Sequence, residues 1–294
     1  MAKLIKGLFN KKEDSEEETM PISDDLLKAA NSIHQVSPPQ LNVGSGYSVG
    51  MERDHNEDTL YTFSSVIADG VGEFQFGLYI VADGMGGHQH GEVASGAAVR
   101  AFSEYIIRNV YLELLSMKPS EMESSIYEAM EKAVDLAQEA VTIDAPGGGT
   151  TLSGMMFFGG RCFIAHVGDS RIYKISNDGV LETVTNDHSL VNRLIELGKI
   201  TEEEAAVHPQ RNVLYQAIGQ SDALNPDFNT ITLKSSEKIM ICSDGLWGVV
   251  KDEDMQTIIS ESKNLVEACQ KLVSEANQNG GPDNISVILV QEIA

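Results

Sequence analysis

The sequence predicts an α+β fold in which antiparallel β-sheets stack on one another and helices cover their outer faces. Short apolar runs such as 78–82 and 163–167 end at glycine or aspartate, which is typical of buried strands that stop at turns. Two consecutive stretches between such runs, at about residues 91–114 and 120–142, have the apolar spacing of helices. Many short strands and two adjacent long helices therefore favour stacked sheets with helices outside.

The N-terminal segment differs in composition from the rest of the chain. A short basic and apolar start leads into the acidic run 13–18 and then to a Pro-Pro pair. Such a stretch rarely builds a core, so residues 1–41 are expected to form a mobile acidic tail and linker, with a short helix at about 24–33 capped by Ser23. The basic start also fits a helix that binds a membrane surface or a partner, although its small apolar surface favours a solvated tail. The globular domain is expected to cover residues 42–294.

Four apolar runs are each expected to form a buried strand with an aspartate at one end. They are the runs 78–82, 163–167 and 239–242, which lead toward Asp83, Asp169 and Asp244, and the run 285–290, which follows Asp283. Thr150 and Thr151 either open a further strand, as β-branched residues often do, or face solvent in a cleft.

The stretch 120–142 is expected to be an amphipathic helix, with Ser120 as its N-cap, because its apolar residues return every three or four positions. The residues of this apolar face are Ile126, Met130, Ala133, Ala137 and Ala140. A smaller helical insert is expected at about 189–218, with Ser189 and Thr201 as N-caps. Glu204 lies three residues after Thr201, which is the spacing of a capping box.

Acidic residues gather at the ends of the expected strands. They are Glu57, Asp58, Asp83, Asp169, Asp244 and Asp283. A single Asp-Gly pair is explained by an ordinary turn, in which glycine tolerates a positive φ. Taken together, these residues lie on segments that can converge on one end of a sheet, where carboxylates repel one another unless cations lie between them. Ligation by oxygen alone favours Mg²⁺ or Mn²⁺ over Zn²⁺.

The composition excludes several classes of protein. With 44 acidic and 21 basic residues the formal net charge is −23, so nucleic acid is expected to be repelled. No stretch of about 20 residues is apolar enough for a transmembrane segment, and the start does not resemble a signal peptide. Cys162, Cys242 and Cys269 are far apart in apolar surroundings, which favours buried reduced thiols and a cytoplasmic location.

Seven motifs follow one another over residues 43–292. They occupy residues 53–58, 81–88 with 91–95, 149–151, 166–171, 187–189, 243–247 and 281–285. In content, order and spacing this series resembles the metal-dependent serine/threonine protein phosphatases, the protein phosphatase 2C or PPM family, in its bacterial form.

The resemblance implies two stacked antiparallel sheets flanked by antiparallel helix pairs, an α-β-β-α sandwich with a small flap insert, and a metal pair in a cleft at one edge. It implies that Asp83 bridges two Mn²⁺ or Mg²⁺ ions and that the Gly84 carbonyl binds one of them. Asp244 and Asp283 match ligands of the other ion. Asp169 matches a residue that, in bacterial members, helps hold a third and weaker ion.

By the same resemblance, Glu57 and Asp58 match an acidic pair that orders metal-bound water, and residues 189–218 take the place of the flap. Arg53 matches the arginine that binds the substrate phosphate, a task that suits the planar fork of a guanidinium. A salt bridge to Asp54 or Glu57 is the alternative for Arg53.

One position departs from the pattern of the eukaryotic relatives. Where these have a histidine proposed to protonate the leaving group, this chain has Met85, as bacterial members do. The general acid is left open between a metal-bound water, which is preferred, and His55 or His88. Elsewhere, His166 is expected to be a satisfied core histidine and Trp247 a core residue.

The leading hypothesis is a phosphatase that uses Mg²⁺ or Mn²⁺ to hydrolyse phosphoserine and phosphothreonine in proteins. Phosphate monoesters hydrolyse so slowly that one general base is not sufficient, whereas two cations can activate water and stabilise the leaving oxygen. The expected partners are phosphorylated proteins, targets of a serine/threonine kinase, and the enzyme is expected to be a monomer.

Two alternatives come from other classes. A catalytically silent relative that serves as a regulatory binding module is disfavoured because Asp83, Asp244 and Asp283 are all present. An acidic calcium-binding protein is disfavoured because no calcium-loop motif occurs.

Overall fold

The described part of the chain begins close to the predicted start of the globular domain. The computed structural model describes residues 39–68, 73–86, 89–115, 123–220 and 224–293. Contacts define one compact unit from Pro38 to Ala294, and its first strand begins at Gln40. The helix predicted at about 24–33 and the predicted N-caps Ser23 and Ser120 lie outside the described residues, as does most of the predicted tail.

Two antiparallel sheets form the centre of this unit. The first has the strand order β1-β11-β10-β7-β8. Its strands are β1 (Gln40–Ser48), β7 (Arg171–Ile175), β8 (Leu181–Thr183), β10 (Lys238–Cys242) and β11 (Ile285–Ile293). The second has the order β2-β3-β5-β6-β9, with β4 paired to β3. Its strands are β2 (Asp58–Ala68), β3 (Glu73–Met85), β4 (Gly149–Thr150), β5 (Leu152–Phe158), β6 (Arg161–Val167) and β9 (Asp227–Thr232).

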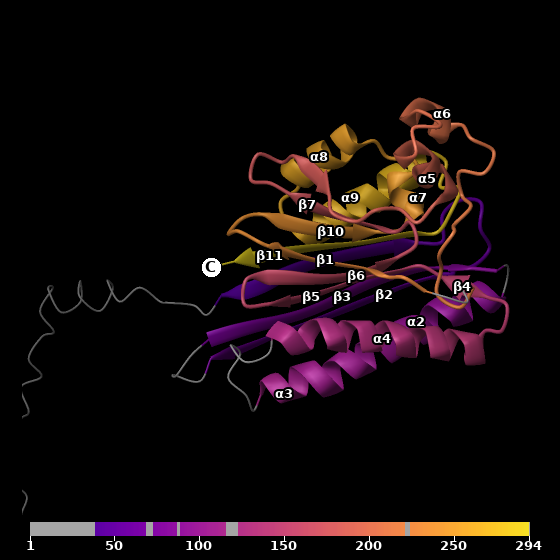
Figure 1. Ribbon diagram of the computed structural model, residues 1–294. Coiled ribbons are helices and arrows are strands. Elements are labelled where there is room, and N and C mark those ends of the chain that lie inside the picture. The colour runs from indigo at the N-terminus through magenta and orange to yellow at the C-terminus, as the bar shows by residue number, and fades with distance from the viewer. Residues whose placement is uncertain (1–38, 69–72, 87–88, 116–122, 221–223, 294) are drawn as a thin grey trace, which may run out of the picture. The chain divides into compact units, whose positions relative to one another are not determined.

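Helices cover the outer face of each sheet (Figure 1). The second sheet is covered by α2 (Gln89–Ile106), which continues through a π-helical turn, η1 (Ile107–Tyr111), into α3 (Leu112–Leu114), and by α4 (Glu123–Asp144). The first sheet is covered by α8 (Asp252–Glu261) and α9 (Leu265–Gln278), with the short α7 (Asp244–Trp247) directly after β10. This arrangement of helices, two sheets and helices confirms the predicted fold class.

Three apolar clusters fill the spaces between these layers, and β3 contributes to two of them. Leu78 and Ile80 belong to the cluster between the second sheet and its helices, whereas Tyr79 and Val81 belong to the cluster between the sheets. Successive side chains of a strand point to opposite faces, so a strand buried on both faces is apolar without alternation. This explains the continuous apolar run 78–82.

Some predicted bounds differ from the structure. β3 does not end before Asp83, as predicted, but continues to Met85, because Gly84 and Met85 pair with β4. Apolar spacing did not predict α8 and α9, although the resemblance implied a second helix pair. In α8 only Met255 and Ile259 are buried, so its apolar stripe is short. The longer stripe of α9 was a usable signal, with buried Leu265, Ala268, Cys269, Leu272 and Ala276.

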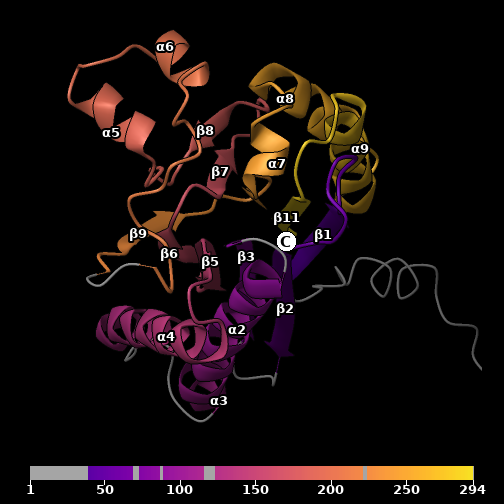
Figure 2. The same ribbon diagram turned by 90° about the vertical axis from the view of Figure 1, so that its right-hand side faces the viewer.

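The predicted insert at 189–218, called the flap below, contains α5 (Leu190–Glu196) and α6 (Glu202–Ala206). These two helices stand apart from the sheets at one end of the unit (Figure 2). The hydroxyl of Ser189 accepts the Asn192 N–H, and Thr201 and Glu204 form a capping box. Both predicted N-caps of the flap are therefore confirmed.

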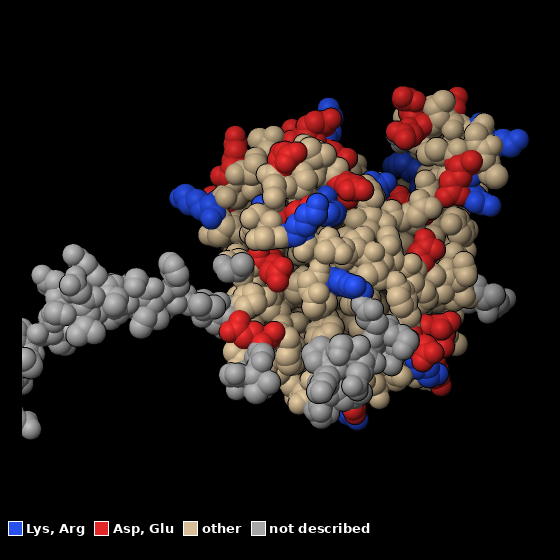
Figure 3. Space-filling model, turned by 60° about the vertical axis from the view of Figure 1, so that its left-hand side comes forward, with Lys and Arg blue, Asp and Glu red and all other residues tan. Residues whose placement is uncertain are grey.

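On the face that Figure 3 shows, acidic side chains are scattered over the described surface, with basic side chains placed between them. This distribution agrees with the net charge of −23. No described helix combines the length and the apolar character that crossing a membrane requires.

Candidate active site

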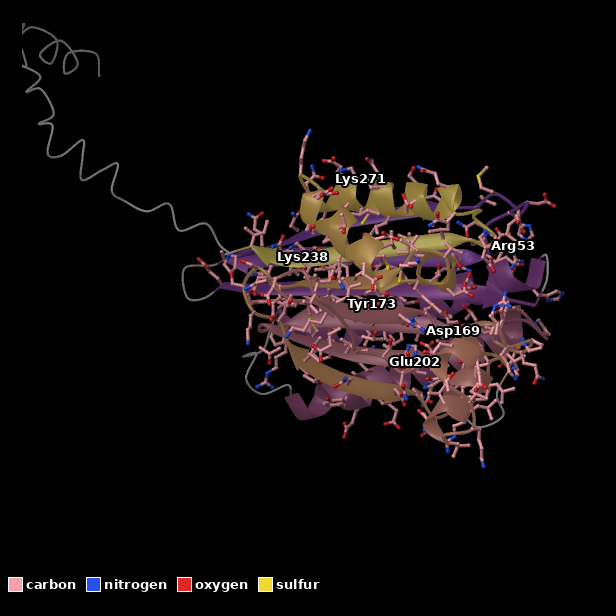
Figure 4. The ribbon with its side chains drawn as sticks, turned by 90° about the horizontal axis from the view of Figure 1, so that it is seen from above. Arg53, Asp169, Tyr173, Glu202, Lys238 and Lys271 are labelled. Atoms are coloured by element: carbon pink, nitrogen blue, oxygen red, sulfur yellow. The ribbon has the colours of Figure 1, made fainter. Side chains whose placement is uncertain are left out.

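The five predicted site aspartates lie at one end of the two sheets, which is called the carboxylate end below. Asp58 opens β2, Asp83 lies near the end of β3, Asp169 follows β6, Asp244 follows β10, and Asp283 precedes β11. Figure 4 labels Arg53 and Asp169 at this end. Burial raises the pKa of Asp83 well above its ordinary value, and repulsion from the other four carboxylates raises it further. The predicted convergence of carboxylates is therefore present, and the structure shows that they come from both sheets.

The backbone of Asp83 is held by two threonines. The Asp83 N–H donates to Thr151 Oγ1 at 2.9 Å, and the Asp83 carbonyl accepts from Thr150 Oγ1 and from the Thr151 N–H, each at 2.9 Å. Thr151 Oγ1 also shares a hydrogen bond with Ser170 Oγ at 2.6 Å. Both threonines are buried, so the suggestion that they face solvent in a cleft is wrong. They position Asp83 instead, a role that sequence reasoning missed.

Gly84 lies where three segments meet at close range. Its N–H donates to the Glu57 carbonyl at 3.2 Å, and that carbonyl also accepts from Ser95 Oγ at 2.6 Å. A Cβ at Gly84 would collide with the carbonyl oxygens of Gly91 and Glu57, and a Cβ at Gly91 would collide with the Glu57 carboxylate. Glycine is needed at position 84 because the end of β3, the start of α2 and the Glu57 backbone approach one another without room for a side chain, whereas a side chain at position 91 would have to displace the Glu57 carboxylate.

Asp58 connects the two sheets. Its Oδ2 accepts a hydrogen bond from Ser243 Oγ at 2.8 Å, and Ser243 lies between β10 and α7. Its Oδ1 is buried and has no hydrogen-bond partner among the described residues. Burial raises the pKa of Asp58 to about 7, while the hydroxyls of Ser243 and Ser286 act in the opposite direction. A buried carboxylate oxygen without a donor is costly unless a cation or proton occupies the position beside it.

Asp244 and Asp169 have the same electrostatic problem. Asp244 Oδ1 is also buried without a partner among the described residues, and burial, followed by repulsion from Asp283, raises the Asp244 pKa to about 6. The pKa of Asp169 is well above its ordinary value, first because of burial and then because of the charge on Asp244. In the metal-free protein these carboxyl groups therefore take up a proton at a higher pH than ordinary aspartates do.

Trp247 and Arg171 brace the backbone beside Asp169. The Trp247 indole N–H donates to the Asp169 carbonyl at 3.0 Å, and the Arg171 guanidinium lies 3.6 Å from the centroid of the Trp247 ring. Arg171 in turn binds both carboxylate oxygens of Asp187. Trp247 is only partly buried, although it packs against a core cluster as predicted. Its hydrogen bond to the Asp169 loop was not predicted.

Arg53 forms an ion pair with a predicted metal ligand. Arg53 Nη2 lies 2.6 Å from Asp283 Oδ2, so the proposed alternatives, pairing with Asp54 or Glu57, are wrong. The Arg53 side chain is 47% exposed, which leaves its guanidinium accessible. The neighbouring His55 Nε2 lies 3.3 Å from Glu57 Oε1, so His55, one of the histidines proposed as general acid, lies close to the acidic pair. His88 lies outside the described residues.

The donor set fits hard cations such as Mg²⁺ and Mn²⁺. It consists of oxygens, two of which are buried without partners among the described residues, and added positive charge would offset the repulsion between the neighbouring carboxylates. Within the described residues, no three His, Cys, Asp or Glu side chains already form a group that could hold an ion. A Mg²⁺ ion usually keeps several waters and takes only one or two carboxylates, so an open arrangement of this kind is compatible with it.

The remaining predicted residues are structural. His166 is buried, with Ser153 Oγ at 2.9 Å from one ring nitrogen and the Asn186 carbonyl at 3.1 Å from the other. Burial, followed by the neighbouring His188, lowers the pKa of His166 to about 3, so the prediction of a satisfied core histidine is confirmed. The three cysteines are buried and free, as predicted.

The comparisons with known proteins agree with this geometry. The family model described as protein phosphatase 2C matches residues 56–283. The chain is 35% identical over 242 residues to the serine/threonine phosphatase stp of Listeria innocua, which covers 82% of this chain and 92% of that protein.

Solved structures show the same similarity. A serine/threonine phosphatase of S. agalactiae superposes with a TM-score of 0.73 at 33% identity, covering 85% of this chain and 99% of that one. The catalytic domain of the phosphatase PstP, in complex with two manganese ions, superposes with a TM-score of 0.68 at 28% identity, covering 87% of this chain and 100% of that one.

Proposed function

Because this chain belongs to the protein phosphatase 2C family, we propose that the carboxylate end is its active site and that two Mn²⁺ or Mg²⁺ ions bind there. The enzyme is a protein-serine/threonine phosphatase. Its proposed substrates are phosphoserine and phosphothreonine in the protein targets of a serine/threonine kinase, met in the cytoplasm by a monomeric enzyme. The two buried carboxylate oxygens that have no partner among the described residues are the observation that carries the proposal.

The proposed ligands are Asp83 for both ions, the Gly84 carbonyl for one, and Asp244 and Asp283 for the other, with Asp169 beside a third and weaker ion. When bound, such a metal pair supplies a water of lowered pKa and a positive field for the leaving oxygen. Thr150 and Thr151 fix the Asp83 backbone, and Ser243 fixes Asp58.

Arg53 is proposed to hold the substrate phosphate. In a protein with a net charge of −23, an anionic substrate needs a local positive group, and Arg53 supplies one at the carboxylate end. Its guanidinium can donate two parallel hydrogen bonds to phosphate oxygens. Asp283 now accepts from the same guanidinium, so phosphate and Asp283 compete for it.

Glu57 and Asp58 are proposed to orient the attacking water by accepting its protons. The Glu57 carboxylate lies beside Gly91 at the start of α2, and Asp58 directs Oδ2 toward Ser243, which leaves Oδ1 without a hydrogen-bond partner among the described residues. Positioning of this kind lowers the barrier by removing the entropy cost of alignment.

A peptide assay tests the proposal. The purified protein should release phosphate from phosphoserine and phosphothreonine peptides, and much less from a matched phosphotyrosine peptide. EDTA should abolish this activity, and Mn²⁺ or Mg²⁺ should restore it, whereas Zn²⁺, which prefers nitrogen and sulfur ligands, should restore little. Undiminished activity in the fully chelated protein would contradict the metal-dependent mechanism.

A further inference from the structure

We infer that Asn284 is a positioning residue that holds residues 49–57, called the Arg53 loop below, in the conformation that binds phosphate. The inference rests on the proposed function, because it assigns Asn284 a role in presenting Arg53 and Glu57 to the substrate. Asn284 follows the predicted ligand Asp283 but is itself neither a proposed metal ligand nor a proposed phosphate-binding residue.

The Asn284 side chain makes three hydrogen bonds, all to backbone atoms of the Arg53 loop. Its Oδ1 accepts the Glu57 N–H at 2.7 Å. Its Nδ2 donates to the carbonyls of Val49 at 2.8 Å and His55 at 2.9 Å. The residue is only 3% exposed. The opposite amide orientation would place donor against donor and acceptor against acceptor, so the three partners fix the side chain.

The Arg53 loop depends on such contacts because it crosses from one sheet to the other. It joins β1 of the first sheet to β2 of the second and contains no helix or strand before Asp58. Its first half is tied to the same segment as Asn284, since the Met51 and Glu52 N–H groups both donate to the Gly281 carbonyl. Gly50, at a φ of +84°, packs against the carbonyls of Gly281 and Asp283 with no space for a Cβ.

Asn284 contacts the proposed metal ligand Asp283 through its backbone and the Arg53 loop through its side chain. Its backbone N–H donates to Asp283 Oδ1 at 2.8 Å, a bond that any non-proline residue at this position can make. Asp283 Oδ2 accepts from Arg53 at 2.6 Å. Truncating the Asn284 side chain therefore removes the three bonds to the Arg53 loop and leaves the backbone contact with Asp283 intact.

The first experiment compares Asn284→Ala with Asn277→Ala. Asn277 is a matched control, because it is an asparagine on α9 whose side-chain amide donates to the Ser48 hydroxyl just before the loop. That hydroxyl accepts the Gly50 N–H, so Asn277 is linked to the loop through Ser48, and among the described residues its side chain makes no hydrogen bond to a backbone atom of residues 49–57. Asn284→Ala should raise KM and lower kcat on a phosphopeptide, reducing kcat/KM by about 10²-fold, the usual cost of a displacement of about 1 Å in an active site. Asn277→Ala should behave like the unaltered protein, and unchanged kinetics in Asn284→Ala would overturn the inference.

Calorimetry with Mn²⁺ supplies a readout that does not depend on turnover. Asn284→Ala should bind Mn²⁺ with nearly the affinity of the unaltered protein, because the backbone bond to Asp283 remains. Loss of Mn²⁺ binding would instead make Asn284 a support of the metal ligand and overturn the inference.

A double-mutant cycle tests whether Asn284 acts through Arg53. If the loop no longer presents Arg53 in Asn284→Ala, then adding Arg53→Ala should cost much less in KM than it does in the unaltered protein. Fully additive effects on KM would show that the two residues act independently and would contradict the inference.

Hydrogen exchange tests the Asn284 clamp, meaning the three hydrogen bonds from the Asn284 side chain to the Arg53 loop, without a measurement of activity. In the unaltered metal-free protein the Glu57 amide should be protected from exchange, and Asn284→Ala should lose that protection if the variant folds. Rapid exchange of the Glu57 amide in the unaltered protein would overturn the clamp. If the phosphatase assay failed while Glu57 was protected, the proposed function would fail and the clamp would stand.

Discussion

The carboxylate end and the flap lie in the same unit but are held by contacts of different range. At the carboxylate end, Ser243 binds Asp58 across 185 positions of sequence and Asn284 binds Glu57 across 227. In the flap, the Thr201 hydroxyl binds the Glu204 N–H three positions away. The first region therefore forms only when both sheets are assembled, whereas the helix ends of the second are stabilised by their own sequence.

The two regions also differ in burial. α5 buries none of its residues, whereas Asp58 and Asp244 each bury a carboxylate oxygen that has no partner among the described residues. Buried uncompensated charge lowers the stability of the metal-free fold, and such cost is characteristic of functional sites. The carboxylate end therefore carries an electrostatic cost that α5 of the flap does not.

The largest expected effect comes from Asp244→Asn. It should lower kcat on an aryl phosphate by more than the roughly 10–100-fold that loss of an outer-shell partner costs at metal sites, because a proposed direct ligand is lost. It should also stabilise the metal-free protein at pH 8 on the order of 2–3 kcal/mol, because a buried charge whose pKa is raised to about 6 disappears. Denaturant unfolding in EDTA, together with steady-state kinetics in Mn²⁺, measures both effects.

Asp135→Asn is the matched control, because Asp135 is exposed on α4 far from the proposed ligands in sequence. It should change neither activity nor stability appreciably. If Asp244→Asn retained normal kcat at saturating Mn²⁺, Asp244 would not be a ligand, and the contrast between the two regions would lose its functional meaning.

A smaller effect is expected at Arg53. Arg53→Ala should lower kcat/KM by about 10²-fold, mainly through KM, since two charge-assisted hydrogen bonds of at least about 1.5 kcal/mol each are lost. Arg53→Lys should recover part of the charge effect but not the two-point grip. Kinetics on one phosphopeptide compare the three proteins, and equal values for lysine and arginine would mean that only the charge matters.

Sequence patterns predicted the aspartates of the carboxylate end better than the residues that hold them. Asp83, Asp169 and Asp244 were found because each comes shortly after an apolar run of the sequence, which is a local signal. Asn284 and Thr151 carry no such signal, because their partners are brought close only by the pairing of distant strands. For the same reason, the predicted partners of Arg53 were its sequence neighbours, whereas the structure pairs it with Asp283.

The pH dependence of stability should separate the carboxylate end from the rest of the protein. Asp58 and Asp244 have folded-state pKa values raised to about 7 and about 6, so the folded state binds protons more tightly than the unfolded state. Stability of the metal-free protein should therefore fall as pH rises from 5 to 8. Surface acids with lowered pKa values, such as Glu196 and Glu267, act only below their ordinary pKa of 4.5. His166, whose pKa is lowered to about 3, opposes the trend below its ordinary pKa of 6.5, because only the unfolded state then binds that proton. The pKa values of Asp83 and Asp169 are raised as well, so four carboxyl groups outweigh this one histidine.

Thermal unfolding in EDTA at several pH values measures this trend. Added Mn²⁺ should raise Tm most at pH 8, where the carboxylates are ionised, and Asp244→Asn should flatten the profile without metal. A Tm that increases with pH in EDTA would show that the buried carboxylates are compensated by groups other than cations.

The smallest expected effect is Thr201→Ala in the flap. It removes the hydroxyl that accepts the Glu204 N–H in the capping box of α6, which should lower local stability by about 1 kcal/mol. Because the contact is local and exposed, exchange of the α6 amides should accelerate, while Tm and kcat on an aryl phosphate should stay unchanged. Thr257→Ala on α8 is the control, since its exposed hydroxyl bonds to the Glu253 carbonyl within the helix and caps no helix end. A loss of kcat in Thr201→Ala would mean that the flap supports the catalytic geometry itself. The contrast between an active site held by contacts distant in sequence and a flap stabilised by local contacts would then be wrong.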